Sequence, residues 1–361
     1  MHRLLFWFFL AASLVASLGC SPDFTPYWKV DKLRILAIQA DPVVAKEMEP
    51  VTLSALLYAP DDQNVEYDWS WCPFRVSAQD DYHCPIDEED LEALLEEVDA
   101  DFDVDDPFDL GESAQATFVN IFEAQEVREF CEMVRREIIE EFDDAELAGF
   151  LPGGDCSEGY EITVRLEVST DDDTLAASKR FMLWGGAEEY NKNPAVEDLQ
   201  VRPADEDDLD ELRDRAGWDV DAGAAHHDQW VSVPIDEPLS VVDDIALEMR
   251  TLIDSDSLLI YTPPTPQGDN AEQPEPREES IVYRHFVSNG ELDSSYLLYV
   301  PDENILDEAS IAELTFDFSD TDEGEECGRP VDDGCAVDLW SVIRDSRYGV
   351  DWIERRLIVV D

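Results

Sequence analysis

The chain is poor in positive charge. It has 24 lysine and arginine residues against 88 aspartate and glutamate residues, which gives a formal net charge of −64 over 361 residues. No stretch is basic enough to follow a phosphate backbone, so the composition excludes nucleic-acid binding. The acids are interleaved with a hydrophobic content of 44%, so we expect a folded acidic protein rather than a disordered acidic tail.

The sequence also lacks the common short catalytic motifs. It contains no G-x-S-x-G, no H-E-x-x-H, no Walker phosphate loop and no G-x-G-x-x-G. Histidine is scarce: His226 and His227 are adjacent, and neighbouring residues on a strand point to opposite faces. His83 and His285 each stand alone in the sequence. We therefore predict a protein that is not an enzyme, with no catalytic residue, no cofactor and no metal site.

A long hydrophobic run occurs at the N-terminus. Met1-His2-Arg3 provides a basic start, and residues 4–18 are apolar apart from two serines. That run is shorter than the roughly 20 residues that a stable membrane-spanning helix needs. The small residues that follow are typical of a peptidase cleavage site, so residues 1–19 are predicted to be a signal peptide.

The signal peptide ends at a cysteine. The stretch "SLGC", residues 17–20, resembles the lipobox of bacterial lipoproteins, although Ser17 stands where Leu is commonest. The resemblance implies that Cys20 becomes the first residue and carries diacylglycerol and palmitate, and two or more acyl chains hold a protein stably on a membrane. Ser21, in place of Asp, implies the outer membrane, on its periplasmic face or at the cell surface. The alternative is an ordinary cleaved signal peptide whose Cys20 pairs with another cysteine.

The remaining cysteines are even in number, as expected for an exported protein in an oxidising compartment. Short separations in the sequence favour three disulfides. An exchange of partners between the first two pairs is the alternative, because the inserted helix can cross the strand that ends in "WSWC". The favoured pairs are Cys72–Cys84, Cys131–Cys156 and Cys327–Cys335.

Most of the chain alternates apolar and polar residues with a period of two. The stretches "VEYDWSW", "YEITVRLEV", "LTFDF" and "DWIERRLIVV" all do so. This alternation predicts half-buried strands with one wet face, typical of antiparallel sandwiches. We expect a mainly β protein. Residues 20–30 would form a tether, residues 31–188 a first domain, residues 189–198 a linker and residues 199–361 a second domain.

Two segments have a helical period instead. Residues 86–98 and 123–143 each place their apolar side chains on one face. We interpret both as helices inserted into the first domain at about residues 86–148, with their apolar faces turned to the core.

Several stretches resemble one family. "LRILAIQADPVVAKEMEPVTLSALLYAP" and "YDWSWCPF" resemble the opening of an immunoglobulin-like domain in myxobacterial-type surface lipoproteins. "YRHFVSNGELDSSY" and "VDLWSVIRDSRYGVDW" resemble the later strands of a second such domain, with Tyr348 where a glycine is common. The resemblance implies two immunoglobulin-like antiparallel β-sandwiches and brings no catalytic residues.

One acidic stretch has the spacing of a calcium-binding loop. Its candidate ligands occupy positions 1, 3, 5, 9 and 12 of such a loop. The sixth position, which requires glycine for a sharp turn, is an aspartate followed by proline, and acidic chains produce such matches by chance. The stretch "FDLGESAQATF" is equally consistent with the start of a sandwich strand, which we favour over a calcium site. The candidate ligands are Asp101, Asp103, Asp105, Asp109 and Glu112.

Together these patterns predict a surface lipoprotein with a structural or adhesive role, held to the membrane by its lipid anchor. Its partner would be an envelope protein or a polysaccharide. The alternative is an envelope hydrolase that uses acidic residues near the helical insertion. A deep cleft with converging carboxylates would favour the hydrolase, and a convex acidic surface would favour adhesion.

Overall fold

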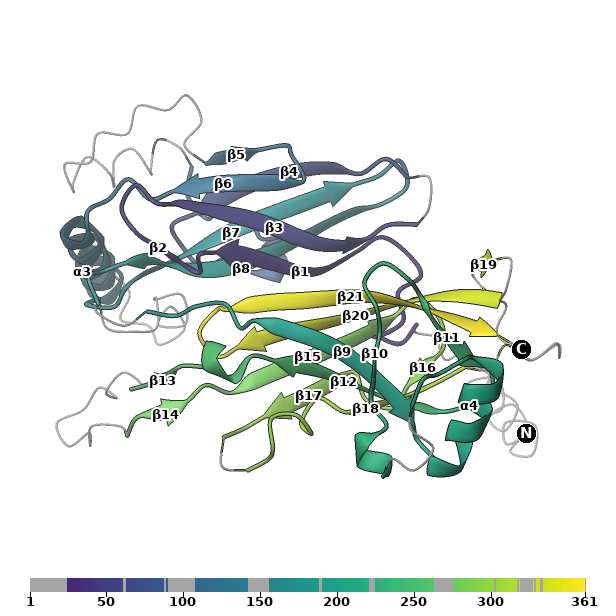
Figure 1. Ribbon diagram of the computed structural model, residues 1–361. Coiled ribbons are helices and arrows are strands. Elements are labelled where there is room, and N and C mark those ends of the chain that lie inside the picture. The colour runs from purple at the N-terminus through teal and green to yellow at the C-terminus, as the bar shows by residue number, and fades with distance from the viewer. Residues whose placement is uncertain are drawn as a thin grey trace, which may run out of the picture.

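The structure, a computed structural model, consists of two β-rich halves that lie one above the other (Figure 1). Cys20, Asp101, Asp103, Asp105 and most of the helix predicted at 86–98 lie outside the residues that it describes. The described residues are 25–60, 63–87, 89, 108–141, 156–187, 190–220, 225–262, 275–301, 303–316, 318, 327, 329–331 and 334–360, without the side chains of 137–141.

The N-terminal half, residues 31–187, contains two sheets that share one apolar core. Trp69, Tyr160 and Phe181 are fully buried in that core. One sheet has the order β1 (Arg34–Asp41), β3 (Pro50–Tyr58), β6 (Gln115–Val119). The other has the order β2 (Val44–Ala45), β8 (Thr174–Trp184), β7 (Gly159–Ser169), β4 (Glu66–Cys72), β5 (Asp109–Gly111).

The C-terminal half, residues 196–360, again contains two large sheets, with smaller elements at their ends. The first sheet has the order β10 (Val231–Ser232), β9 (Val196–Pro203), β12 (Leu247–Ile253), β18 (Ala312–Thr315), β16 (Glu291–Leu292). The second has the order β11 (Leu239–Val242), β21 (Val350–Val360), β20 (Gly334–Asp345), β15 (Ile281–Val287), β17 (Tyr296–Tyr299), with β19 (Pro330–Val331) beside β20. A two-stranded ribbon joins β13 (Ile260–Tyr261) to β14 (Arg277–Glu278).

The described helices are few. α3 (Ala124–Glu141) lies against β7 and β8 at one end of the N-terminal half, where a helix is predicted at 123–143 (Figure 1). α4 (Leu209–Arg215) lies near β11. Short 3-10 turns occupy η1 (Ala78–Asp80), η3 (Glu206–Asp208), η4 (His226–Asp228) and η5 (Ser255–Ser257). Within the described ranges, no helix is both long and apolar enough to cross a bilayer.

The structure therefore is mainly β, and most strand pairs are antiparallel, as predicted. Two edge pairings differ, because β2 pairs with β8 in parallel and β11 pairs with β21 in parallel. The wet face predicted for residues 160–168 is also wrong in part. β7 lies between β8 and β4, and its polar residues Glu161, Thr163 and Arg165 are buried. Other parts of the chain cover that face, which a local alternation of residues does not reveal.

The predicted tether and linker are shorter than expected. Residues 28–30 pair with the end of β15, because the Val30 amide donates to the Val287 carbonyl at 2.8 Å and the Val287 amide donates to the Trp28 carbonyl at 3.0 Å. Val30 is fully buried. β9 begins at Val196, inside the segment 189–198 that the sequence assigns to a linker. Residues 28–30 thus belong to the folded body.

All three disulfides favoured by sequence separation are formed. Cys72–Cys84 ties the end of β4 to the loop that follows it, and Cys131–Cys156 ties α3 to the segment before β7. Cys327–Cys335 closes the hairpin end at the start of β20.

Candidate functional site

The two halves meet along a seam that is partly apolar. Leu36 and Leu56 of the N-terminal half pack in one buried cluster with Trp340, Val342 and Val350 of the C-terminal half. The ring of Tyr58 meets that of Trp340 edge-on, with centroids 5.5 Å apart. Because buried apolar contacts run continuously across the seam, the halves are fixed against each other rather than joined by a free linker.

A buried polar cluster completes the seam. The carboxylate of Glu161 on β7 is only 2% exposed and accepts hydrogen bonds from Arg75 at 2.7 and 3.1 Å and from Arg180 at 3.3 Å. Tyr348, from the turn between β20 and β21 in the other half, donates its hydroxyl proton to the same carboxylate. We call these four residues the seam latch. Burial also raises the pKa of Tyr348 to about 12, so its hydroxyl remains a donor at neutral pH.

The turn that carries Tyr348 has an unusual backbone. Tyr348 adopts a φ of 79°, in the left-handed region that favours glycine. This is the position where the sequence resemblance places a glycine, so the conformation is the one that a glycine would adopt there. The tyrosine side chain adds the bond across the seam that a glycine would lack.

Hydrogen bonds from the N-terminal half and from the segment between the halves also hold this turn. The Nζ of Lys179 on β8 donates to the Tyr348 carbonyl oxygen. The side-chain amide of Asn191 donates to the Asp345 carboxylate and to the Arg347 carbonyl, both at 2.9 Å. Burial lowers the pKa of Lys179 to about 7, although the nearby Asp345 carboxylate opposes the shift. The backbone at Arg347 is therefore fixed from both sides.

A cleft of about 650 Å³ opens beside this turn, at the end of the seam where β13 and the β20–β21 turn lie (Figure 1). Both halves and the segment between them contribute to its walls, so the cleft exists only because the halves are locked together. Its lining residues are Glu158, Ala187, Tyr190, Lys192, Leu259, Ile260, Tyr261, Thr262 and Arg347.

Two cationic side chains, Lys192 and Arg347, line the cleft, and two more, Lys46 and Arg277, contact tyrosines of its wall. We call these four residues the cationic rim. The Arg347 guanidinium lies 4.8 Å from the ring centre of Tyr261, and Arg277 donates to the Tyr261 hydroxyl at 3.0 and 3.2 Å. The Lys46 ammonium lies 3.8 Å from the ring centre of Tyr190. Cations placed over tyrosine rings are stabilised without a carboxylate partner.

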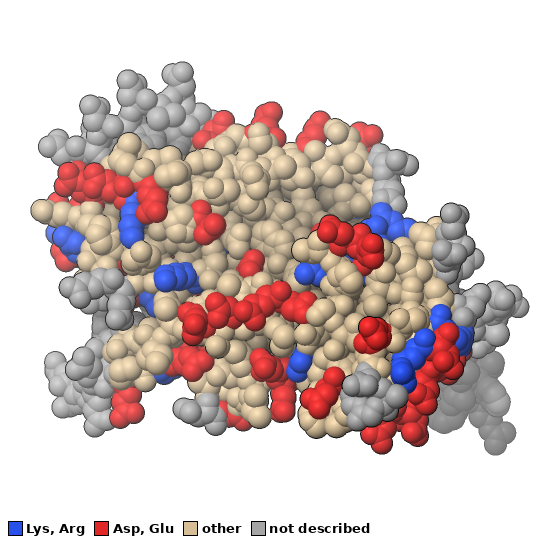
Figure 2. Space-filling view, in the orientation of Figure 1, with Lys and Arg blue, Asp and Glu red and all other residues tan. Residues whose placement is uncertain are grey.

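Charges of both signs are spread over the visible face. Figure 2 shows aspartate and glutamate side chains along the top, the middle and the lower part of the molecule. Lysine and arginine side chains form small groups at the left, among them ones beside α3, and further groups at the right.

A buried carboxyl lies behind the cleft. Glu279 is 1% exposed, and its Oε1 lies 3.7 Å from Arg347, beyond hydrogen-bond distance. Its Oε2 accepts a hydrogen bond from the Leu259 amide at 3.2 Å. Burial raises the pKa of Glu279 to about 7, and the nearby Asp345 adds to the shift. Near neutral pH Glu279 therefore neutralises Arg347 only in part.

The histidines singled out in the sequence do not converge. The Nε2 of His226 donates one hydrogen bond at 2.9 Å to the Pro203 carbonyl, and His227 lies 3.4 Å from the Asp228 carboxylate. His285 is fully buried, bonds to the Ser310 carbonyl at 2.9 Å, and has its pKa lowered to about 4 by burial. His83 is exposed. Across the described ranges, no three His, Cys, Asp or Glu side chains are grouped to hold a metal.

Of the residues in the calcium-like stretch, Asp109 and Glu112 are described. Asp109 begins β5 and accepts a hydrogen bond from the Gly111 amide at 2.7 Å. Glu112 lies in the turn that follows β5. The described part of this stretch is thus the start of a strand.

Two other buried carboxylates are tied to arginines. Asp338 accepts bonds from Arg329 at 2.6 Å and from Arg356 at 2.5 Å, and Glu161 is held in the seam latch. A carboxylate that is already paired in this way is poorly placed to serve as a general acid or base.

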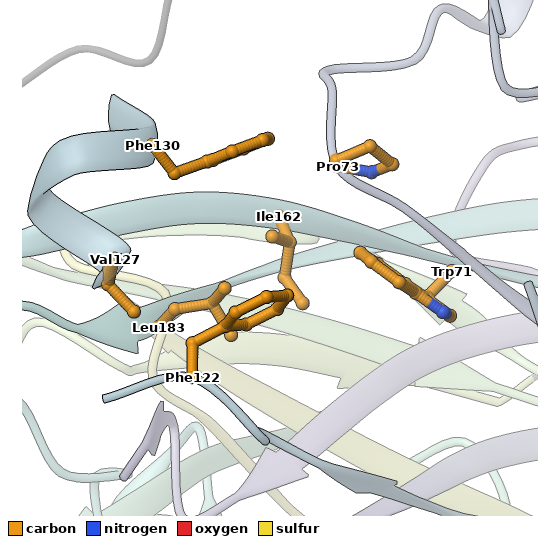
Figure 3. A pocket seen from close by; sticks show the side chains of 7 residues that line it. All are labelled: Trp71, Pro73, Phe122, Val127, Phe130, Ile162 and Leu183. Atoms are coloured by element: carbon orange, nitrogen blue, oxygen red, sulfur yellow. The ribbon is translucent and has the colours of Figure 1, made fainter. Parts of the chain in front are cut away.

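A second pocket lies under α3 and is apolar throughout (Figure 3). Its volume is only about 20 Å³, enough for one water molecule but without polar partners to hold one. Val127 and Phe130 extend from α3 over the sheet, so the apolar stripe of this helix faces the core as predicted. The pocket is lined by Trp71, Pro73, Phe122, Val127, Phe130, Ile162 and Leu183.

The cationic rim is absent from the sequence-based expectations. Its members come from four separate segments of the chain, and none belongs to a recognisable motif. A hint lies in the scarcity of lysine, since two of the chain's five lysines, Lys46 and Lys192, flank this one cleft.

No protein-family model and no curated protein sequence matches the chain. Among solved structures, the three N-terminal domains of the highly immunogenic outer capsid protein (Hoc) of bacteriophage RB49 align with a TM-score of 0.19 and 11% identity, covering 91% of this chain and 70% of that chain. Dimeric latent PorU from Porphyromonas gingivalis aligns with a TM-score of 0.19 and 10% identity, covering 91% of this chain and 24% of that chain. Similarity at this level carries no argument about function.

Proposed function

We propose that the protein is an outer-membrane-anchored surface lipoprotein, built from two immunoglobulin-like sandwiches, that binds an envelope component in the seam cleft. The observation that carries the proposal is the position of the cleft. It lies beside the β20–β21 turn, about the length of β15 away from the place where residues 28–30 join the body.

The register of the strands sets this distance. On β15, Val287 pairs with residues 28–30 and lies opposite Leu339, whereas Ile281 lies opposite Asp345 at the β20–β21 turn. Six residues of β-strand span roughly 20 Å. The entry point of the chain and the cleft are therefore separated by the length of β15.

The predicted lipid anchor relates this separation to the orientation of the cleft relative to the membrane. Cys20 precedes Tyr27 by seven residues, which reach at most about 25 Å when fully extended. A lipid on Cys20 would hold the end of the body that carries residues 28–30 against the membrane. The cleft then faces away from the bilayer, where an envelope component can reach it.

Co-sedimentation with isolated envelope material tests the binding role. We expect the purified protein to sediment with the fraction that contains its partner. The double variant Lys192→Gln with Arg347→Gln should lose most of this binding, because it removes two cations of the rim. Lys32→Gln is the matched control, since Lys32 is exposed and close to the entry of the chain.

The proposal is wrong if the native protein sediments with no envelope fraction. It is also wrong if the double variant binds as well as the Lys32→Gln control. Thermal unfolding of each variant in parallel shows whether the fold has been kept.

A further inference from the structure

Building on the proposed binding role, we infer that the seam cleft recognises acidic sugars of a polysaccharide through their carboxylate or phosphate groups. The inference concerns the chemistry of the ligand, which neither the fold nor the position of the cleft specifies.

The first argument is electrostatic. A net charge of −64 repels anions from most of the surface, and screening limits that repulsion to about 8 Å at physiological ionic strength. At such short range the local charges decide whether an anion can approach. The charged side chains that line the cleft are two cations, Lys192 and Arg347, and one carboxylate, Glu158. Lys192 makes no ion pair with any described carboxylate, so its ammonium is available to an incoming anion.

The second argument is that contacts on the backbone and the side chain hold Arg347 in position. Its amide donates to the Asp345 carboxylate at 2.6 Å, its carbonyl accepts from Asn191 at 2.9 Å, and its guanidinium lies over Tyr261. A guanidinium held in a fixed plane offers two parallel N–H donors, which match the oxygens of a carboxylate or a phosphate. Because the turn is already rigid, little ordering entropy would be lost on binding.

The third argument is the shape and lining of the cleft. Its volume of about 650 Å³ lies within the usual range of small-molecule sites and suits a few sugar units. Tyr190 and Tyr261 add flat rings that combine an apolar face with a polar tip, and such rings suit ligands with both kinds of surface.

An acidic peptide would fit the cleft less well. Peptides commonly bind by extending a sheet edge or by placing apolar anchors in a groove. The one strand in the cleft wall, β13, is two residues long, and the other walls are a loop, a connecting segment and a turn. The structure thus offers no long strand edge for a peptide to extend.

Titration calorimetry on the full chain tests this inference with defined probes. We expect trigalacturonate, glucose 6-phosphate or both to bind, and the methyl ester of trigalacturonate and free glucose not to bind. Lys192→Gln should weaken binding of the charged probe about tenfold, since it removes one close charge. Lys32→Gln should leave binding unchanged.

Binding of the neutral ester as tight as that of the acid would overturn the inference, and so would equal effects of Lys192→Gln and Lys32→Gln. Tighter binding of a poly-glutamate peptide than of either sugar would assign the cleft to acidic peptides instead. If the protein sediments with envelope material through its cationic rim but binds no acidic sugar, the ligand class is wrong and the proposed function stands. If it sediments with no envelope fraction, the proposed function itself fails.

Discussion

Replacing Glu161 with glutamine should destabilise the whole molecule, because this carboxylate joins the two halves. It is almost fully buried and receives bonds from Arg75, Arg180 and Tyr348. Glutamine has nearly the same shape but no charge, so Arg75 would be left in a poorly solvated place without its anion. Removing one partner of a buried ion pair costs about 3–5 kcal/mol. We expect a loss in this range in the free energy of unfolding.

Urea unfolding followed by tryptophan fluorescence measures this loss. Glu211→Gln is the matched control, since Glu211 pairs with Arg215 on α4 and both of these side chains are exposed. Exposed pairs contribute about 1 kcal/mol or less. Tyr348→Phe, alone and combined with Glu161→Gln, gives a double-mutant cycle, in which contacting residues typically show coupling of about 0.5–3 kcal/mol.

The reasoning is refuted if Glu161→Gln costs no more than Glu211→Gln. It is equally refuted if the cycle shows no coupling between Glu161 and Tyr348, because the latch would then not connect the halves.

Further expectations concern other parts of the chain. Because the pKa of Lys179 is lowered to about 7, its folded form gives up a proton that the unfolded chain keeps up to about pH 10. The native protein should therefore gain about 3 kcal/mol in unfolding free energy between pH 6 and pH 9 relative to Lys179→Met. A constant difference between the two proteins would contradict this cause. Replacing Cys131 and Cys156 by alanine removes a disulfide that spans a separation of 25 residues. The free energy of unfolding should fall by about 2–4 kcal/mol, which is measured as a lower urea midpoint. An unchanged midpoint would show that α3 is held by packing alone. Sodium chloride should raise the melting temperature by screening the net charge of −64, and calorimetry in which the melting temperature falls or stays constant would rule out self-repulsion as a major term. Intact mass of membrane-extracted protein should show acyl chains on Cys20, and an unmodified, water-soluble product would contradict lipidation.

Local sequence patterns predicted the strands and the helix whose formation depends mainly on residues close to one another in the sequence. The alternating residues 65–71 and 160–168 lie in or beside β4 and β7, and the residues with a helical period at 123–143 contain α3. The burial of Glu161 was missed, because a turn almost 190 residues further along the chain covers it. Alternation indicates which face of a strand is apolar, but a polar face can still be buried when arginines of the same half and a tyrosine from a distant turn cover it.

The cleft was missed for the same reason. Lys46, Lys192, Arg277 and Arg347 lie in four different segments, and each has the appearance of an ordinary surface residue in the sequence. Only the packing of one half against the other brings them around a single opening. The scarcity of lysine was visible in the sequence, but it did not indicate where the cleft lies.

The pairing of residues 28–30 with β15 has a mechanical consequence. If the chain is pulled from its N-terminal end while the β20–β21 turn is held, the tension runs along β15 and β20 rather than across them. The antiparallel bonds between Ile281 and Asp345 at one end and Val287 and Leu339 at the other then carry the load together in shear. Strands loaded in this way must slide as a unit before any bond is released, whereas a strand peeled from its end opens one bond at a time. The unfolding rate under force, which governs how long such a protein survives a pull, would then depend on the direction of pulling.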